Sequence, residues 1–385
     1  MALKRTEEER INRPFCRVLA MLPVVMVASV LISLLSVQNA FPTTAIALHW
    51  LAPTSNTDGS PLNSLAGFKI HYGTSSGTYT NSIDVGYVAS YTLSNLPDAT
   101  YYIAATDYDS LGRESDYSNE VIRTSITLAS KIAVFYNGAW YMDPNGNGTW
   151  DGTASDKLYP TFGNGLPNAI PVAGDWDGTG VIRIGVFSNG SWYLDMNGNG
   201  VWDGGVADKV IPNFGVGLPN AIPVTGDWNG SGTTKIGVFS NGSWYLDMNG
   251  NGVWDGGVVD KVIPNFGVGL PNAIPVTGDW NGSGTTKIGV FSNGSWYFDM
   301  NGNGVWDGGV VDKVIPNFGV GVPNAIPVTG DWNGSGTIKV GVVSNGIWYL
   351  DMKGDGVWDG GVLDVMIPNF GQGLNGAIPL VLKKK

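Results

Sequence analysis

Apolar and polar residues alternate in short runs along most of the chain, and the runs are separated by turns rich in glycine and asparagine. Such runs are typical of β-strands joined by tight turns. One stretch of the chain contains four runs in succession: AIPVTGDW (221–228), KIGVFSNG (235–242), SWYLDMN (243–249) and the broken run VWDGGVVDKVIPNF (253–266). We therefore expect an all-β protein.

These runs recur with a period of 52 residues. Residues 183–234 and 235–286 differ at only two positions, and the same spacing separates the members of two series: Asp175, Asp227, Asp279 and Asp331, and Trp192, Trp244, Trp296 and Trp348. Four antiparallel strands in a repeat of about fifty residues are the content of one blade of a β-propeller. We expect residues 131–385 to form such repeats.

The two ends of the repeat array indicate how it closes. The first unit begins at Lys131 without the AIPVTGDW-type strand, and the last unit ends on AIPLVL (377–382), which matches that strand. Closing a ring in this way leaves no sheet edge unpaired. We therefore predict a five-bladed β-propeller closed by the C-terminal strand 377–382, with ITLAS (126–130) as an alternative source of the missing strand.

Residues 44–123 form a separate group of strand-like runs and precede a linker at 124–130. The segment resembles a fibronectin type III domain: Trp50 matches an early core tryptophan, Tyr72 falls on the third strand, and Tyr102 follows Leu96 at the spacing of a tyrosine corner. The resemblance implies a β-sandwich in which the Tyr102 hydroxyl bonds to the upstream backbone. We expect this domain to act as a spacer.

A nine-residue loop, DMNGNGVWD in its commonest form, occurs once in each repeat unit. It places oxygen-bearing side chains at positions 1, 3, 5 and 9, as calcium requires, although asparagine–glycine turns also form without any ion. The loop resembles the calcium loops of FG-GAP and VCBS propeller repeats. Because it offers only two carboxylates and two amides, we expect weak calcium binding, about 0.1–1 mM. The candidate ligands are Asp143, Asn145, Asn147, Asp151, Asp195, Asn197, Asn199, Asp203, Asp247, Asn249, Asn251, Asp255, Asp299, Asn301, Asn303 and Asp307.

The fifth copy of the loop and a second loop in each unit carry cations of their own. Lys353 stands at position 3 of the fifth copy, so we expect no calcium there. GDWNGSGTTK (226–235) resembles the same calcium loops, but Lys235 replaces the acid at position 9. We expect a lysine or arginine to pair with Asp227 and its equivalents and to replace the ion.

Charge and the N-terminal segment bear on location. The net charge of -11 argues against binding to nucleic acid. Residues 1–40 resemble an export signal, with basic residues before the apolar run 18–37, and we expect a cleaved signal peptide in preference to a signal-anchor helix. We therefore expect an extracellular or cell-surface protein of bacterial origin, monomeric, touching the membrane only through that segment if it is uncleaved.

The residue types of the repeats bear on chemistry. Residues 131–385 contain no His, Cys or Glu, which removes the usual groups of acid–base, nucleophilic and zinc catalysis. We therefore expect no enzyme but an adhesion protein that binds glycans or extracellular proteins, with Trp254 the most exposed tryptophan of its unit. The alternatives are a structural module without a ligand and a glycan hydrolase that uses paired carboxylates such as Asp203 and Asp208.

Overall fold

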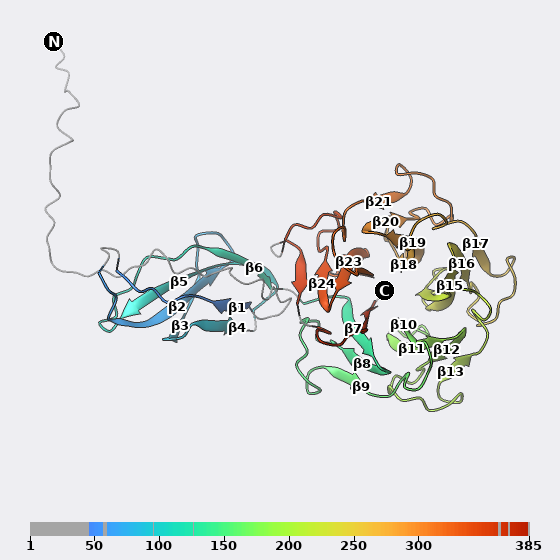
Figure 1. The fold of residues 1–385 in the computed structure, drawn as a ribbon, viewed down its shortest axis with the longest axis horizontal. Coiled ribbons are helices and arrows are strands. Elements are labelled where there is room, and N and C mark those ends of the chain that lie inside the picture. Colours follow the sequence, from blue (N-terminus) through green and yellow to red (C-terminus); the bar gives the residue numbers. More distant parts are fainter. Residues whose placement is uncertain are drawn as a thin grey trace, which may run out of the picture. The chain divides into compact units, whose positions relative to one another are not determined.

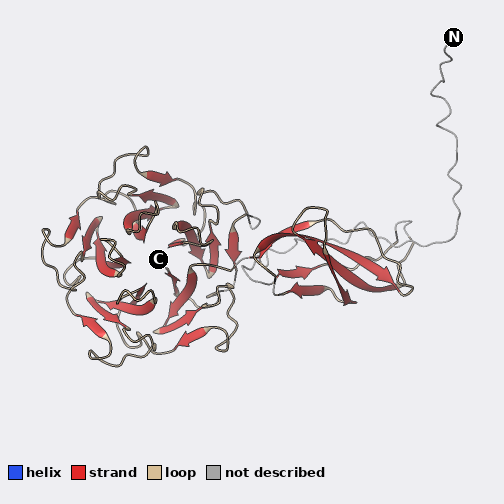
Figure 2. Ribbon diagram, turned by 180° about the vertical axis from the view of Figure 1, so that it is seen from behind, coloured by secondary structure: helices blue, strands red, loops and turns tan. Residues whose placement is uncertain are grey.

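The structure is a computed structural model that describes residues 46–56, 60–94, 96–125, 127–360, 363–368 and 370–383. The described residues form strands, turns and loops, without any helix (Figure 2). The apolar run at 18–37 lies outside them, so the expected signal or anchor helix is not described. Within the described residues no helix is long and apolar enough to cross a membrane.

The strands between residues 46 and 125 form two sheets. One pairs β1 (Ile46–His49) with β4 (Ser90–Leu93). The other has the order β3-β2-β5-β6, with β2 at Leu65–Gly73, β3 at Asn81–Gly86, β5 at Ala99–Asp109 and β6 at Val121–Ser125. Trp50 is buried and packs edge-on against Phe68 of β2, with the ring centroids 5.5 Å apart.

The tyrosine corner is formed by Tyr101, one residue before the predicted position. The Tyr101 hydroxyl donates to the Pro97 carbonyl oxygen at 3.1 Å. Successive side chains of a strand point to opposite faces. Tyr101 and Ile103 lie on the buried face of β5, whereas Tyr102 lies on the other face and is half-buried. The prediction of Tyr102 was therefore wrong, because it relied on spacing and not on strand alternation.

Residues 131–382 form five four-stranded antiparallel sheets, and this repeat is β-propeller-like (Figure 1). In order from the innermost strand they are as follows: β26 (Ile378–Leu382), β7 (Lys131–Tyr136), β8 (Ala139–Met142), β9 (Lys157–Tyr159); β10 (Ile170–Gly174), β11 (Arg183–Ser188), β12 (Ser191–Leu194), β13 (Lys209–Ile211); β14 (Ile222–Gly226), β15 (Lys235–Ser240), β16 (Ser243–Leu246), β17 (Lys261–Ile263); β18 (Ile274–Gly278), β19 (Lys287–Ser292), β20 (Ser295–Phe298), β21 (Lys313–Ile315); β22 (Ile326–Gly330), β23 (Lys339–Ser344), β24 (Ile347–Leu350), β25 (Val365–Ile367).

The second and third strands of each sheet are joined by a two-residue Asn-Gly turn. Ser188 pairs with Ser191 across one such turn, and Asn189 and Gly190 both have positive φ, 50° and 89°. Turns of this kind match the twist of a hairpin and favour asparagine followed by glycine. The repeated NG dipeptides are therefore explained by backbone geometry.

The innermost strands contact one another in a closed cycle, β10, β14, β18, β22, β26 and back to β10 (Figure 1). Threonine hydroxyls link neighbouring strands of this cycle. Thr225 donates to the Ala173 carbonyl at 3.1 Å, and Thr277 donates to the Thr225 carbonyl at 3.0 Å. The second to fifth sheets are therefore bonded in succession near the middle of the ring.

The two ends of the repeat array meet in the same sheet. β26 pairs with β7, from Ile378 opposite Phe135 to Leu382 opposite Lys131. The Ser130 hydroxyl also accepts a bond from the Asp331 amide at 2.9 Å, as Thr286 does for Asp227 within the array. The missing inner strand is therefore supplied by 378–382, and the segment before Lys131 instead caps a loop of the last sheet.

The apolar core lies between neighbouring sheets. One cluster combines Trp192, Ile211 and Phe214 of the second sheet with Ile236 and Val238 of the third. Trp192 is fully buried, and its Nε1 donates to the Phe214 carbonyl oxygen at 2.8 Å. Because each core needs two sheets, no sheet can bury its apolar face alone.

Candidate functional site

The nine-residue loops connect the third and fourth strands of each sheet. In the loop that follows β12, Asp195 is fully buried, its Oδ1 accepts the Gly198 amide at 2.7 Å and its Oδ2 accepts the Gly200 amide at 2.8 Å. Burial raises the pKa of this carboxyl in spite of these bonds. Asp195 therefore holds the loop backbone in its bent form.

Two asparagine side chains converge on the last carboxylate of the loop. Nδ2 of Asn197 and Nδ2 of Asn199 both donate to Asp203 Oδ2, at 2.9 and 2.5 Å. These two bonds, with Asn197 first, lower the pKa of Asp203. Positions 3, 5 and 9 therefore lie together, whereas position 1 is turned toward the backbone.

The candidate residues of the other loops repeat this arrangement. Bonds from position 3 and position 5 to position 9 link Asn249 and Asn251 to Asp255, and Asn301 and Asn303 to Asp307. In the first loop Asn145 and Asn147 donate to Asp151 at 3.5 and 2.5 Å. The position-1 residues Asp143, Asp247 and Asp299 are buried and accept backbone amides.

Asp208, one of the two carboxylates considered for hydrolysis, accepts hydrogen bonds from backbone amides. Asp208 is 3% exposed, its Oδ2 accepts the Asp203 amide at 2.8 Å and its Oδ1 accepts the Met196 amide at 3.1 Å. Both oxygens thus join the two ends of the loop. Its geometry is that of a structural residue.

The loops of the second to fifth sheets also dock on the preceding sheet. The Tyr159 hydroxyl of β9 donates to the Gly198 carbonyl at 2.8 Å, and a Cβ at Gly200 would lie 2.0 Å from the Tyr159 ring. Gly200 has a φ of 75° as well, so only glycine fits. The glycines of the loop are thus explained by packing between sheets.

The second loop of the third sheet surrounds an ammonium group. Lys235 Nζ lies 3.3 Å from Asp227 Oδ1, 2.7 Å from Asn229 Oδ1, 2.6 Å from Ser231 Oγ and 3.2 Å from the Thr233 carbonyl. These are positions 1, 3, 5 and 7 of a calcium loop. Lys235 is buried, so its charge replaces an ion at the centre of the loop.

The other copies of this loop follow the same principle with one difference. Lys287 and Lys339 contact Asp279 and Asp331 at 3.5 and 3.3 Å. Arg183 instead pairs with Asp177, at position 3 of its loop, at 2.7 Å. The predicted partner of this arginine, the Asp at position 1, was therefore wrong, because the longer guanidinium reaches the additional carboxylate that this copy carries.

Lys353 fills the fifth nine-residue loop as expected. Its Nζ lies 2.7 Å from Asp355 Oδ2 and 2.5 Å from Asp359 Oδ2, and these two carboxylates raise its pKa. Within the described residues no group of three or more His, Cys, Asp or Glu side chains is placed to hold a metal.

The donor types of loops one to four nevertheless fit calcium. The side chains of positions 3, 5 and 9 lie together, and the two sister arrangements centred on Lys235 and Lys353 hold a cation among the same positions. In loops one to four the asparagine amides would turn their oxygens inward to receive it. Bound calcium would have a structural role: its positive charge would hold the oxygen atoms of the loop together.

One tryptophan per sheet is exposed, as expected for Trp254. Its exposed fraction is 39%, against 8% or less for Trp228 and Trp244 of the same unit. The Trp254 ring meets Tyr245 of its own sheet edge-on at 5.7 Å and Phe214 of the preceding sheet at 6.2 Å. The exposed ring therefore lies where two neighbouring sheets meet.

The same aromatic group recurs around the ring. Trp150, Trp202, Trp306 and Trp358 are 37–40% exposed, and each lies 5.3–5.7 Å from a tyrosine of its own sheet. The tyrosine and phenylalanine partners were not anticipated. The sequence did contain a sign of the tyrosine contact, because the spacing between Tyr245 and Trp254 is the same in every unit. Knowing the position of the third strand shows that both side chains lie on one face.

Comparison with known proteins adds no assignment to this geometry, because the sequence matches no protein-family model and no curated protein.

Proposed function

We propose that the chain is an exported, non-catalytic binding protein of the cell surface or the extracellular space. The two sheets at 46–125 act as a fibronectin type III-like sandwich and spacer, and residues 131–382 act as a five-bladed propeller with FG-GAP/VCBS-like loops. Two features support this assignment: the pairing of β1 with β4 beside the sheet β3-β2-β5-β6, and the closed cycle of inner strands.

The ligand that the surface favours is a glycan. The observation that carries this proposal is the exposed tryptophan that every sheet places on a tyrosine, from Trp150 to Trp358. Tryptophan has the largest side chain, and exposing part of it to water in every sheet contributes little to the apolar core. An aromatic ring that is open on one face stacks on the apolar face of a sugar ring while its neighbours hold it in place.

Repetition explains how weak sites suffice. Five exposed tryptophans on one ring can engage a polymer of repeating sugars together, so the apparent affinity exceeds that of one site by orders of magnitude. In this proposal calcium at loops one to four stiffens the loops that carry the tryptophans, since Trp202 directly precedes the candidate ligand Asp203.

A glycan array probed with residues 41–385, with calcium and with a chelator, tests this function. We expect binding to several polysaccharides with repeated neutral sugars, stronger when the glycan is dense on the surface. Absence of binding to every glycan would favour a structural module, and release of reducing ends would favour a hydrolase.

A further inference from the structure

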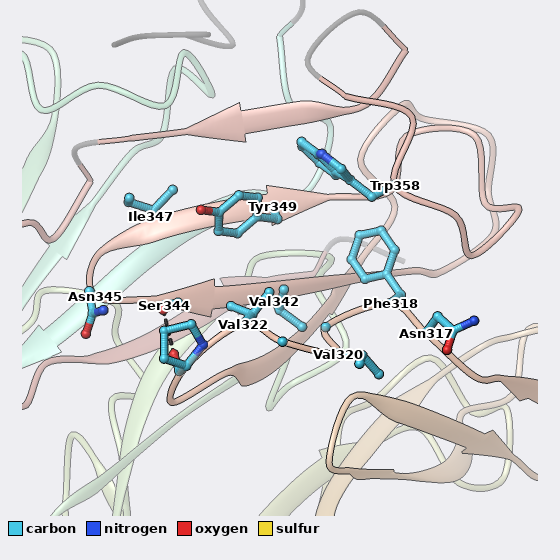
Figure 3. A pocket seen from close by; sticks show the side chains of 13 residues that line it. Asn317, Phe318, Val320, Val322, Val342, Ser344, Asn345, Ile347, Tyr349 and Trp358 are labelled. Atoms are coloured by element: carbon cyan, nitrogen blue, oxygen red, sulfur yellow. Dashed lines mark hydrogen bonds between the residues drawn. The ribbon is translucent and has the colours of Figure 1, made fainter. Parts of the chain in front are cut away.

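A cavity lies beside Trp358, the exposed tryptophan of the fifth sheet. Between the fourth and fifth sheets lies a cavity of about 390 Å³, lined by the segment 317–323 and by residues of β23 and β24 (Figure 3). Trp358 and Phe318 stand at one end of it, and Ser344 and Asn345 at the other. A cavity of this volume is in the range of small-molecule sites.

Two of the residues that line this cavity differ from their counterparts in the other units. Val322 stands where the other units have a leucine, at Leu166, Leu218, Leu270 and Leu374. Ile347 stands where three units have Ser191, Ser243 and Ser295. The shorter Val322 removes a methylene from the floor, and Ile347 adds an apolar wall in place of a hydroxyl that elsewhere donates to a proline carbonyl, as Ser243 does to Pro264 at 2.9 Å.

The lining defines the chemistry of the occupant. The residues that line the cavity include no charged side chain, and Val320, Val322, Val342 and Ile347 make much of its wall. The occupant is therefore neutral, because a charged group would lose its hydration without gaining a partner. It also has an apolar part that fits between Val322 and Ile347.

A polar contact is available at the far end. In three other units the equivalent asparagine is engaged, as when Asn272 Nδ2 donates to Asn293 Oδ1 at 3.2 Å. Among the residues that the structure describes, the Asn345 side chain makes no such bond with Asn324, and it is exposed beside the cavity. Its amide can therefore both donate to and accept from a ligand amide or hydroxyl.

We propose that this cavity is a specific subsite for a neutral N-acetylated amino sugar, which rests on the glycan-binding function proposed above. The sugar ring stacks on Trp358, the acetamido methyl group packs between Val322 and Ile347, and the acetamido group bonds to Asn345. The exposed tryptophans of the other four units bind sugar rings without this preference, because a leucine stands at the position of Val322.

The variant Val322→Leu tests the subsite with little risk to the fold, since leucine occupies the same position in the other four units. The probes are the trimer of N-acetylglucosamine and the trimer of glucose, titrated by calorimetry and observed by saturation-transfer NMR. We expect the wild-type chain to bind one acetylated trimer tightly, with strongest saturation at the acetamido methyl group. Val322→Leu should weaken this binding at least about tenfold, the effect of one methylene in an apolar pocket.

A gain-of-function variant complements this loss. Leu270→Val with Ser295→Ile places the same apolar pair between the third and fourth sheets and should add a second site for the acetylated trimer, weaker than the first because Asn293 is already bonded to Asn272. Glycan binding that is equal for both trimers, or unchanged in Val322→Leu, would overturn the subsite and leave the proposed function standing. Absence of binding for both trimers and for every glycan on the array would overturn both.

Discussion

At the scale of single residues, the loop centres hold cations that differ in burial. Lys235 and Asp227 are both buried, and the ammonium is bonded by three side-chain oxygens and a carbonyl. Lys353 is bonded as closely but is 44% exposed. The energetic value of such a pair depends on burial, because water screens an exposed ion pair.

Replacing Lys235 should therefore cost far more than replacing Lys353. We expect Lys235→Met to lower the free energy of unfolding by about 3–5 kcal/mol, because it leaves the Asp227 carboxylate buried without its cation. The control Lys353→Asn, which restores the residue of the other loops, should change it by less than about 1 kcal/mol. Denaturant titration measures both, and equal losses would contradict the structural role of the buried lysine.

Asp143 gives the ring a pH dependence. Burial raises the pKa of its carboxyl to about 6, with Asp156 nearby adding to the effect. The folded protein thus binds a proton at this carboxyl more tightly than the unfolded chain, in which an aspartate titrates near 3.9. The contribution of Asp143 to the free energy of unfolding therefore falls as pH rises from about 4 to about 6.

The variant Asp143→Asn removes this titration. We expect the unfolding free energy of the wild type, relative to the variant, to fall by up to about 3 kcal/mol between pH 4 and pH 7. Denaturant titrations at the two pH values measure it. A wild-type advantage that is the same at both values would show that Asp143 titrates normally.

At the scale of elements, loops and closing strands differ in how far the sequence predicts them. The all-β class, the four strands per unit and the exposure of Trp254 follow from apolar alternation and glycine-rich turns, which act locally. The Tyr101 corner and the Arg183–Asp177 pair do not, because each depends on which way a side chain points. The hydrogen bonds that join Asn197 and Asn199 to Asp203 likewise depend on loop geometry that composition leaves open.

Strand β26 should be indispensable to the ring. Truncation after residue 377 removes the strand that pairs with β7, together with Leu382, which lies in the core beside Ala133. We expect loss of cooperative unfolding, because the first sheet would then expose an open edge. A circular permutant that places residues 378–383 before Thr127 should fold, and its failure to do so would show that the strand is needed for some other reason.

Calcium should stabilise the ring modestly through loops one to four. With dissociation constants of about 0.1–1 mM, 10 mM calcium adds about 1.4–2.7 kcal/mol per occupied loop. Melting curves with calcium and with a chelator measure this effect. Magnesium is the control ion, since it requires shorter and more regular coordination. An unchanged melting temperature would remove calcium from the account.

At the scale of the whole molecule, the units are nearly identical, so the few positions at which they differ are easy to recognise as candidates for a specific function. Most positions are the same in each unit because each has the same neighbours, so the cores between sheets recur from cluster to cluster. Against this background Val322 and Ile347 stand out, yet the sequence alone does not place them opposite each other. Only the contact between the fourth and fifth sheets does so.

The repetition of exposed tryptophans around the ring leads to the most direct prediction about glycan binding. The five exposed tryptophans should contribute to glycan binding together, whereas the buried series that contains Trp192 should contribute only to folding. A chain in which Trp150, Trp202, Trp254, Trp306 and Trp358 are all replaced by alanine should keep its fold, since these residues are the exposed ones.

Binding of the wild type and of this five-alanine variant to a surface densely coated with a neutral polysaccharide, measured by surface plasmon resonance, tests the central claim. Circular dichroism provides the control for folding. The account predicts a loss of apparent affinity of at least about a hundredfold, in line with the gain that multivalency gives. Equal binding by the two folded proteins would contradict it.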